Sequence, residues 1–139
     1  MERSGIKKIL DKNEITSNYL IQSMERVTPA YCKPQRRGIC KVTYEDPRLD
    51  FINLKRINKE IQDKLVAKIN YILKESDGVV VEDQIKKGVI EGRVRDRLAK
   101  KRHNRIIVID SRKNVNKFSH GIIKTDQLGA LKSVFPDFN

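Results

Sequence analysis

The chain has few of the residues that hold structural metals or form disulfide frameworks. It contains two cysteines, Cys32 and Cys40, and two histidines, His103 and His120, and the cysteines form no Cys-x-x-Cys motif. Structural zinc sites require four closely spaced cysteines and histidines. We therefore expect two reduced thiols, no bound metal and no cofactor.

Long apolar runs are missing as well. No stretch approaches the roughly 18 uninterrupted apolar residues of a membrane-spanning helix. The start of the chain, MERSGIKKIL, lacks the apolar core of a secretory signal, and Glu2, Asp11 and Glu14 do not fit an acid-poor transit peptide. We expect no membrane partner, and if the protein works in an organelle we expect it to be made there.

Positive charge is the abundant property. The 139 residues, enough for one domain with a modest core, include 30 lysines and arginines against 18 acidic residues, which gives a net charge of +12. This balance predicts a polyanionic partner. Nucleic acid is favoured over a membrane surface, because the basic residues do not lie opposite a broad apolar face of a single helix.

Two segments concentrate the charge. Residues 91–103, EGRVRDRLAKKRH, are dense in arginine and lysine, and we expect residues 91–105 to form a basic loop between two strands. In residues 33–40, KPQRRGIC, Pro34 and Gly38 frame two arginines, which predicts a shaped loop that leads into a strand. Phosphate is the anion that arginine clusters bind best.

The apolar pattern predicts short elements along the rest of the chain. A short helix is expected at residues 4–12, within an N-terminal extension that has no core of its own. Strands are expected at residues 38–45, 79–81 and 105–110, and the last of these is the clearest buried strand. The apolar end of the chain, residues 128–138, is expected to dock on a neighbour.

The middle of the chain is ambiguous. In residues 51–73 apolar side chains recur every three or four positions, which is typical of an amphipathic helix. Residues 65–73 also alternate between apolar and polar, which is typical of a strand. The local pattern favours the helix.

The two basic segments resemble the signatures of one known family. CKPQRRGIC followed by KVTYEDP is similar to the first signature of small-subunit ribosomal protein twelve, the family found at the decoding centre. GVIEGRVRDRLAKKRH is similar to the second signature, and the interval between the two is also similar. The strand RIIVID and the segment RKNVNKFSHG then follow in the family's order.

The resemblance covers residues 29–121 and implies the family's fold. That fold is all-β, a five-stranded barrel of the oligonucleotide-binding type (OB-fold). It puts Leu54–Ile57 and Leu65–Ile72 on two neighbouring strands, so we predict a hairpin there against the helical periodicity. The implied domains are an N-terminal extension at 1–35 that carries the short helix and threads into rRNA, the barrel at 36–110, and a basic and apolar C-terminal tail at 111–139.

The resemblance also implies a function, which is not enzymatic. The protein would be a structural constituent of the small ribosomal subunit that binds rRNA at the decoding centre and supports translational accuracy. Its partners would be small-subunit rRNA, neighbouring ribosomal proteins and, indirectly, the mRNA and tRNA of the A site. Departures from the family pattern in both loops are typical of mitochondrial ribosomal proteins, so the matrix ribosome is the expected location and the bacterial cytoplasm the alternative.

Site residues follow from the same match. The implied decoding-loop residues are Pro47, Arg48, Leu49, Asp50, Arg95 and Asp96. The implied rRNA-binding residues are Lys33, Gln35, Arg36, Arg37, Arg48, Arg93, Arg95, Lys100, Lys101, Arg102, His103, Arg105, Arg112, Lys113 and Lys117.

Two alternatives of another class stay open. Asp46, Asp50 and Asp83, with Lys55, are candidates for the carboxylates and lysine of a metal-dependent nuclease, in which a divalent ion activates water against a phosphodiester. A DNA-binding or RNA-binding regulatory protein shares the basic composition. Neither alternative explains the two spaced signatures.

Overall fold

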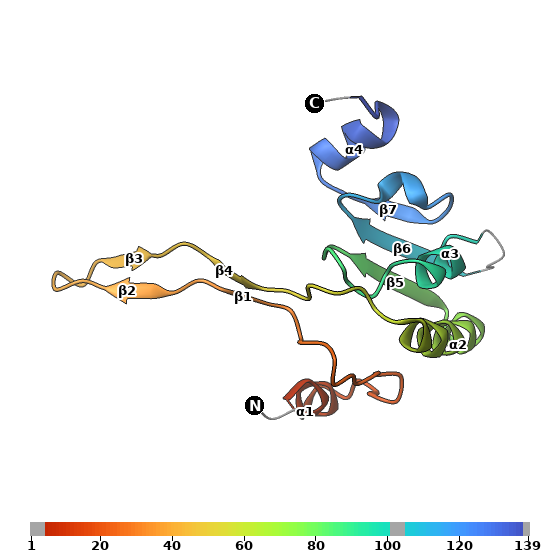
Figure 1. The fold of residues 1–139 in the computed structure, drawn as a ribbon, viewed down its shortest axis with the longest axis horizontal. Helices are drawn as coiled ribbons and strands as arrows, with labels where there is room; N and C mark the ends of the chain where they lie inside the picture. The colour runs from red at the N-terminus through yellow and green to blue at the C-terminus, as the bar shows by residue number, and fades with distance from the viewer. Residues whose placement is uncertain (1–4, 101–104, 138–139) are drawn as a thin grey trace.

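The structure is a computed structural model that describes residues 5–100 and 105–137. It combines a body of helices and parallel strands with a long two-stranded projection (Figure 1). In chain order the elements are α1 (Gly5–Lys12), β1 (Ala30–Cys32), β2 (Gln35–Arg37), β3 (Thr43–Glu45), β4 (Leu49–Phe51), α2 (Lys59–Glu75), β5 (Gly78–Asp83), α3 (Arg93–Leu98), β6 (Ile106–Ser111), η1 (Val115–Lys117), β7 (Ile122–Lys124) and α4 (Gln127–Val134).

A three-stranded parallel sheet with the order β5-β6-β7 forms the centre of the body. Its strands are rich in valine and isoleucine, which favour the pleated conformation. Val81, Ile109 and Ile123 stand side by side in the register, and Ile109 on the middle strand is fully buried. Because the strands are parallel, their carboxyl ends share one edge of the sheet. Figure 1 shows β5 and β6 pointing toward the side from which the projection extends.

Helices cover one face of this sheet. Leu73 of α2 and Val94 and Leu98 of α3 pack on the sheet residues that face them, with Phe118 completing the cluster. Burying such a side chain stabilises a fold by about 1.5–3 kcal/mol, so each member of this cluster contributes to stability. The buried apolar residues are Ile57, Leu73, Val81, Val94, Leu98, Ile107, Ile109 and Phe118.

Among the described residues, no helix or loop covers the other face of the sheet. Val80, Ile106 and Ile122 on this open face are 69%, 65% and 63% exposed, respectively. The register places Val80 beside Val108 and Val108 beside Ile122, so these three residues form an apolar row across the sheet, and Ile106 lies two residues before Val108 on the same face. Parallel sheets are usually covered on both faces, which makes this surface unusual.

Helix α2 forms because its apolar residues recur at helical spacing and because its first turn is capped. The side chain of Asn58 accepts a hydrogen bond from the Ile61 amide at 2.9 Å. Lys64 lies one turn after Glu60 and donates a hydrogen bond to it. This hydrogen bond holds the pKa of Glu60 below its usual value, and the charge of the lysine adds to the effect. The cap fixes the start of the helix, and the Glu60–Lys64 pair supports its exposed side.

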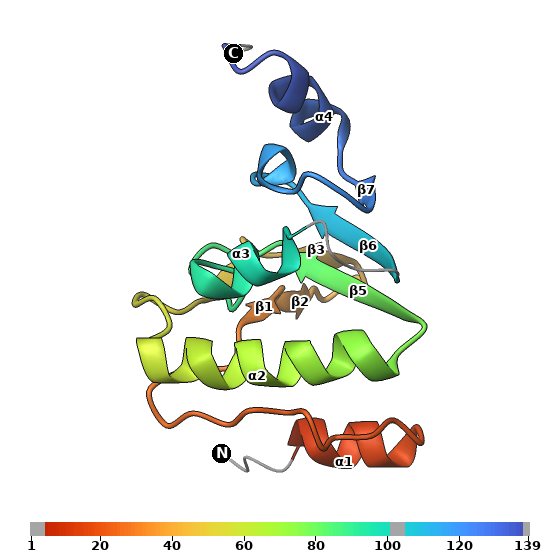
Figure 2. The same ribbon diagram turned by 90° about the vertical axis from the view of Figure 1, so that its right-hand side faces the viewer.

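The N-terminal segment packs on the outer side of α2. Figure 2 shows α1 below α2, on the side away from the sheet. The Tyr19 and Tyr71 rings lie 5.8 Å apart, and Lys68 donates a hydrogen bond to the Asn18 carbonyl oxygen at 2.8 Å. Val27 and the Asn53 side chain exchange two hydrogen bonds of 3.1 and 2.9 Å. These contacts fix the segment to the body.

Residues 30–51 form the projection, which we call the arm. Its strands pair in two antiparallel ladders, β1 with β4 and β2 with β3, and every residue in them is exposed. The Gly38 amide donates to the Val42 carbonyl oxygen at 2.8 Å, which closes a three-residue loop at the end of the arm. Lys41, the last loop residue, has a φ of +60°, as the common three-residue hairpin loop requires.

The expected all-β barrel is wrong. The described residues contain helices and three small sheets of two, two and three strands, and these sheets do not close into a barrel. The predicted hairpin of Leu54–Ile57 and Leu65–Ile72 is wrong as well, because residues 59–75 form α2. The helical periodicity was the correct guide, since apolar side chains every three or four positions can all face one core only in a helix.

Other sequence expectations hold to different degrees. The short N-terminal helix is confirmed as α1, and the strands at 79–81 and 105–110 are confirmed within β5 and β6, allowing for one residue at the boundary. The expected strand at 38–45 is wrong in its first half, where the loop of the arm lies. In the part of the chain that the structure describes, no helix combines the length and the apolar character needed to cross a bilayer.

Candidate nucleic-acid interface

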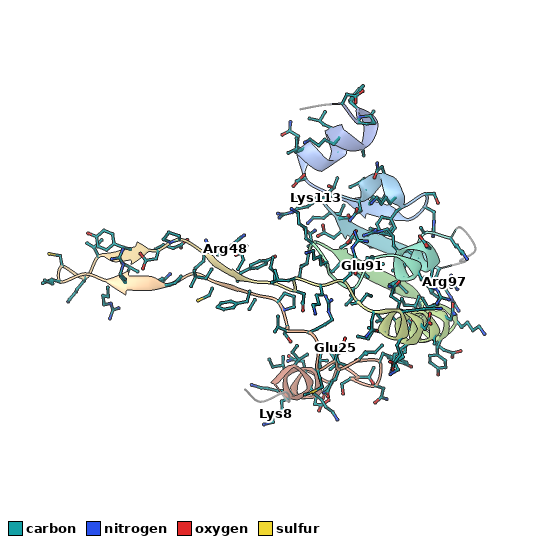
Figure 3. All side chains as sticks on the ribbon, in the orientation of Figure 1. Lys8, Glu25, Arg48, Glu91, Arg97 and Lys113 are labelled. Carbon is teal, nitrogen blue, oxygen red and sulfur yellow. The ribbon has the colours of Figure 1, made fainter. Side chains whose placement is uncertain are left out.

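The arginines of the second basic segment turn toward the body. The loop expected here is wrong for residues 93–98, which form α3, because Val94 and Leu98, four positions apart, enter the core. Arg93 pairs with Asp63 on α2, and Arg97 donates to the Asn70 side chain on the same helix. Figure 3 shows Arg97 beside α2, on the side of the body opposite the arm. These two side chains join α3 to α2.

Arg95 and Asp83 form a buried polar cluster at the carboxyl end of β5. Their side chains are 17% and 5% exposed, and Arg95 Nη2 lies 3.7 Å from Asp83 Oδ2. Asp83 also accepts hydrogen bonds from Ser111 Oγ at 3.2 Å and Asn114 Nδ2 at 2.9 Å. The Arg95 Nε atom is buried and finds no acceptor among the described residues. The cluster ties β5, β6, α3 and the segment after β6 together.

The rest of the second segment is only partly described. Lys100 is exposed after α3, and Arg105 donates to the Lys74 carbonyl oxygen at 2.8 Å. Lys101, Arg102 and His103 lie outside the described residues. A role of this segment in rRNA binding stays a prediction, and the geometry shows that its described arginines also hold the body together.

The shaft of the arm pairs its cations with its own carboxylates. Lys33 lies 2.8 Å from Glu45, and Arg36 lies 2.6 Å from Asp46. Arg48 contacts both oxygens of Asp50 at 2.6 and 2.8 Å, and this hydrogen bonding raises the pKa of the guanidinium above its usual value. Arg48 also stacks on the Tyr31 ring, 4.6 Å from its centroid. Charge along the shaft is therefore largely neutralised within the arm.

The tip of the arm, residues 37–41, differs from the shaft. Arg37 and Lys41 are exposed and form no ion pair with any described residue. Between them Ile39 is 105% exposed, which is full exposure to solvent. The tip thus presents one aliphatic side chain flanked by two available cations.

A second set of cations surrounds a groove between η1 and α4. The groove has a volume of about 550 Å³, and Arg112, Lys113 and Lys132 contribute its positive charge. Asp126 balances part of it, since its Oδ2 lies 3.8 Å from Arg112 Nε. Lys113 projects at the edge of the sheet on the side where the arm extends, as Figure 3 shows. We call this groove, whose cations are Arg112, Lys113 and Lys132, the basic groove.

Sequence reasoning found part of this groove. Arg112 and Lys113 were predicted to bind nucleic acid, and Lys117 lies nearby at the end of η1, where it is exposed. Lys132 was missed because the pattern of residues 128–138 was interpreted as an apolar segment. The sequence spacing contains the signal that would have found Lys132. This lysine follows Leu128 and Gly129 by about one helical turn on α4, so all three residues face the same groove.

The structure does not gather the predicted decoding-loop residues. Pro47, Arg48, Leu49 and Asp50 lie along the arm, whereas Arg95 and Asp96 belong to α3 on the body (Figure 1). Gln35, predicted from the first signature, is exposed on β2. The two sets therefore do not form one surface in the free protein.

The predicted nuclease carboxylates do not come together either. Asp46 and Asp50 are paired with arginines on the arm, and Asp83 is buried with Arg95 in the body. Over residues 5–100 and 105–137 no group of three or more histidine, cysteine, aspartate or glutamate side chains is arranged to hold a metal ion.

A different acidic pair lies at the carboxyl edge of the sheet. Glu82 and Asp110 occupy paired positions on β5 and β6, so their side chains share the open face. Asp110 accepts hydrogen bonds from Gln84 and, at 2.6 Å, from Lys124.

Comparison of the chain with known proteins found no relative. The chain matches no family model, no curated protein and no solved structure.

Proposed function

We propose that this protein binds nucleic acid, with the tip of the arm and the basic groove contacting phosphates. The observation that supports this best is the position of the available cations. Shaft and body arginines are mostly engaged with internal carboxylates or amides, whereas Arg37, Lys41, Lys113 and Lys132 have no such partner among the described residues. Exposed cations that are kept apart from carboxylates suit a dense polyanion.

Small-subunit rRNA is the first partner to test. The two signature segments support it, whereas the barrel fold that the resemblance implied is wrong. Folded rRNA offers closely spaced phosphates to both the arm and the groove. A role in the small ribosomal subunit of a mitochondrion, or of a bacterium, remains part of this proposal.

Binding and its salt dependence test the proposal. Fluorescence anisotropy with a structured RNA and a DNA duplex should show affinity that falls with potassium chloride. The double variant Lys113→Ala, Lys132→Ala should lower the slope of log K against log salt by about 0.9 per lost contact on duplex DNA, or about 0.7 on single strands.

The matched control removes the same charge elsewhere. Lys59→Ala with Lys64→Ala on the exposed side of α2 should leave the slope unchanged. Equal losses in both double variants would mean that net charge, and not this surface, governs binding. Salt-resistant sedimentation with small ribosomal subunits would identify rRNA as the partner, and migration as free protein would remove the ribosomal role.

A second candidate function is metal-dependent cleavage of the bound nucleic acid. The pair Glu82 and Asp110 supports it, because Mg²⁺ is commonly bound by one or two carboxylates together with substrate phosphates. If it holds, Glu82→Gln and Asp110→Asn will each abolish magnesium-dependent cleavage without weakening binding in calcium. Cleavage that persists in both purified variants would assign it to a contaminant or to other residues.

A further inference from the structure

Ile39 is the most exposed apolar side chain of the arm. At 105% exposed it makes no packing contact that the fold could use, and the loop that carries it is held by backbone hydrogen bonds from Gly38 and Lys41. A smaller polar residue would satisfy the loop geometry equally well. The isoleucine therefore serves something other than the stability of the free protein.

The surroundings of Ile39 restrict its partner. Two cations without an ionic partner, Arg37 and Lys41, flank it, and burying them in an apolar protein groove would leave their charges unpaired at a large cost in free energy. Phosphates on either side of a groove would instead pair with both. A ribbon of two β-strands can enter either the major or the minor groove of duplex DNA.

We propose that the arm enters a groove of a nucleic-acid duplex and that Ile39 wedges between neighbouring bases. This inference rests on the proposed function and adds how the arm engages its target. Aliphatic side chains inserted from the minor groove partly unstack a base step. Arg37 and Lys41, on either side of Ile39, would pair with the neighbouring phosphates. The neutralised shaft suits this role, since its own carboxylates keep Lys33 and Arg36 in place along the ribbon.

Base unstacking provides a direct measurement. Duplexes with 2-aminopurine at one internal step, one of DNA and one a hairpin of RNA, should gain fluorescence when the full chain binds. Ile39→Ser should remove that gain and weaken binding about tenfold, as expected for one aliphatic side chain that is no longer buried. Because Ile39 is fully exposed, this variant will fold normally.

The controls separate the inference from the proposed function. Ile122→Ser replaces another exposed isoleucine, on the open face of the sheet, and should retain both affinity and fluorescence gain. Two outcomes would overturn the wedge and leave the proposed function standing. In the first, Ile39→Ser binds in a salt-dependent way with the affinity of the wild-type chain. In the second, the wild-type chain binds the duplex without a gain in fluorescence. Failure of the wild-type chain to bind either duplex at low salt would overturn both. A gain on one probe alone identifies DNA or RNA as the target.

Discussion

Arg95 lies in a segment whose sequence is typical of the surface, yet its side chain belongs to a buried polar cluster. The charge of the segment predicts exposure, whereas the side chain is 17% exposed and faces the buried Asp83. The spacing of Val94 and Leu98 carries the missing signal, because two apolar residues four positions apart mark the buried face of a helix. A charge-based interpretation passes over that spacing.

Removing the Arg95 guanidinium should lower the free energy of unfolding far more than removing that of Arg93. Arg95→Met leaves the carboxylate of Asp83 buried without its charge partner and should lower the free energy of unfolding by about 3 kcal/mol. Arg93→Ala breaks a largely exposed pair with Asp63 and should cost at most about 1 kcal/mol. Urea unfolding of both variants would test this, and equal midpoints would contradict the structural role of Arg95.

At the scale of elements, local pattern was reliable where the core needed it. The periodicity of residues 51–73 and the β-branched run at 105–110 specified α2 and β6, since their apolar faces have to be buried. The extended arm could not be predicted from such a pattern, because none of its strand residues is buried. The parallel order β5-β6-β7 was also beyond local patterns, since pairing depends on partners far along the chain.

The loop of the arm contains a strained lysine whose replacement should stabilise the tip. Lys41 has a φ of +60°, a region that costs an ordinary L-residue about 1–2 kcal/mol and that glycine adopts at no steric cost. Lys41→Gly should therefore slow hydrogen exchange at the Gly38 amide, which bonds across the loop. Lys41→Ala removes the same charge but keeps the strain, so protection equal to that of the glycine variant would exclude this explanation.

At the scale of the whole molecule, the same side carries the arm, the carboxyl edge of the sheet and Lys113 (Figures 1 and 3). Residue-level matches to a family could not reveal this arrangement. They predicted that Arg112 and Lys113 bind rRNA, but they placed both residues in a tail that follows a β-barrel, and the described residues form no such barrel. The candidate interface therefore depends on a fold that only the tertiary structure supplied.

The open face of the sheet has a consequence for how molecules of this protein behave toward each other. Val80, Ile106 and Ile122 expose an apolar surface, and a net charge of +12 keeps copies apart at low ionic strength. Salt shortens the reach of that repulsion to about 10 Å at 0.1 M and about 3 Å at 1 M. Light scattering should consequently show self-association that grows with salt, and Val80→Thr with Ile122→Thr should suppress it. Colloidal stability and nucleic-acid affinity would then respond to different faces of one molecule, and a purification buffer chosen to release nucleic acid would favour aggregation.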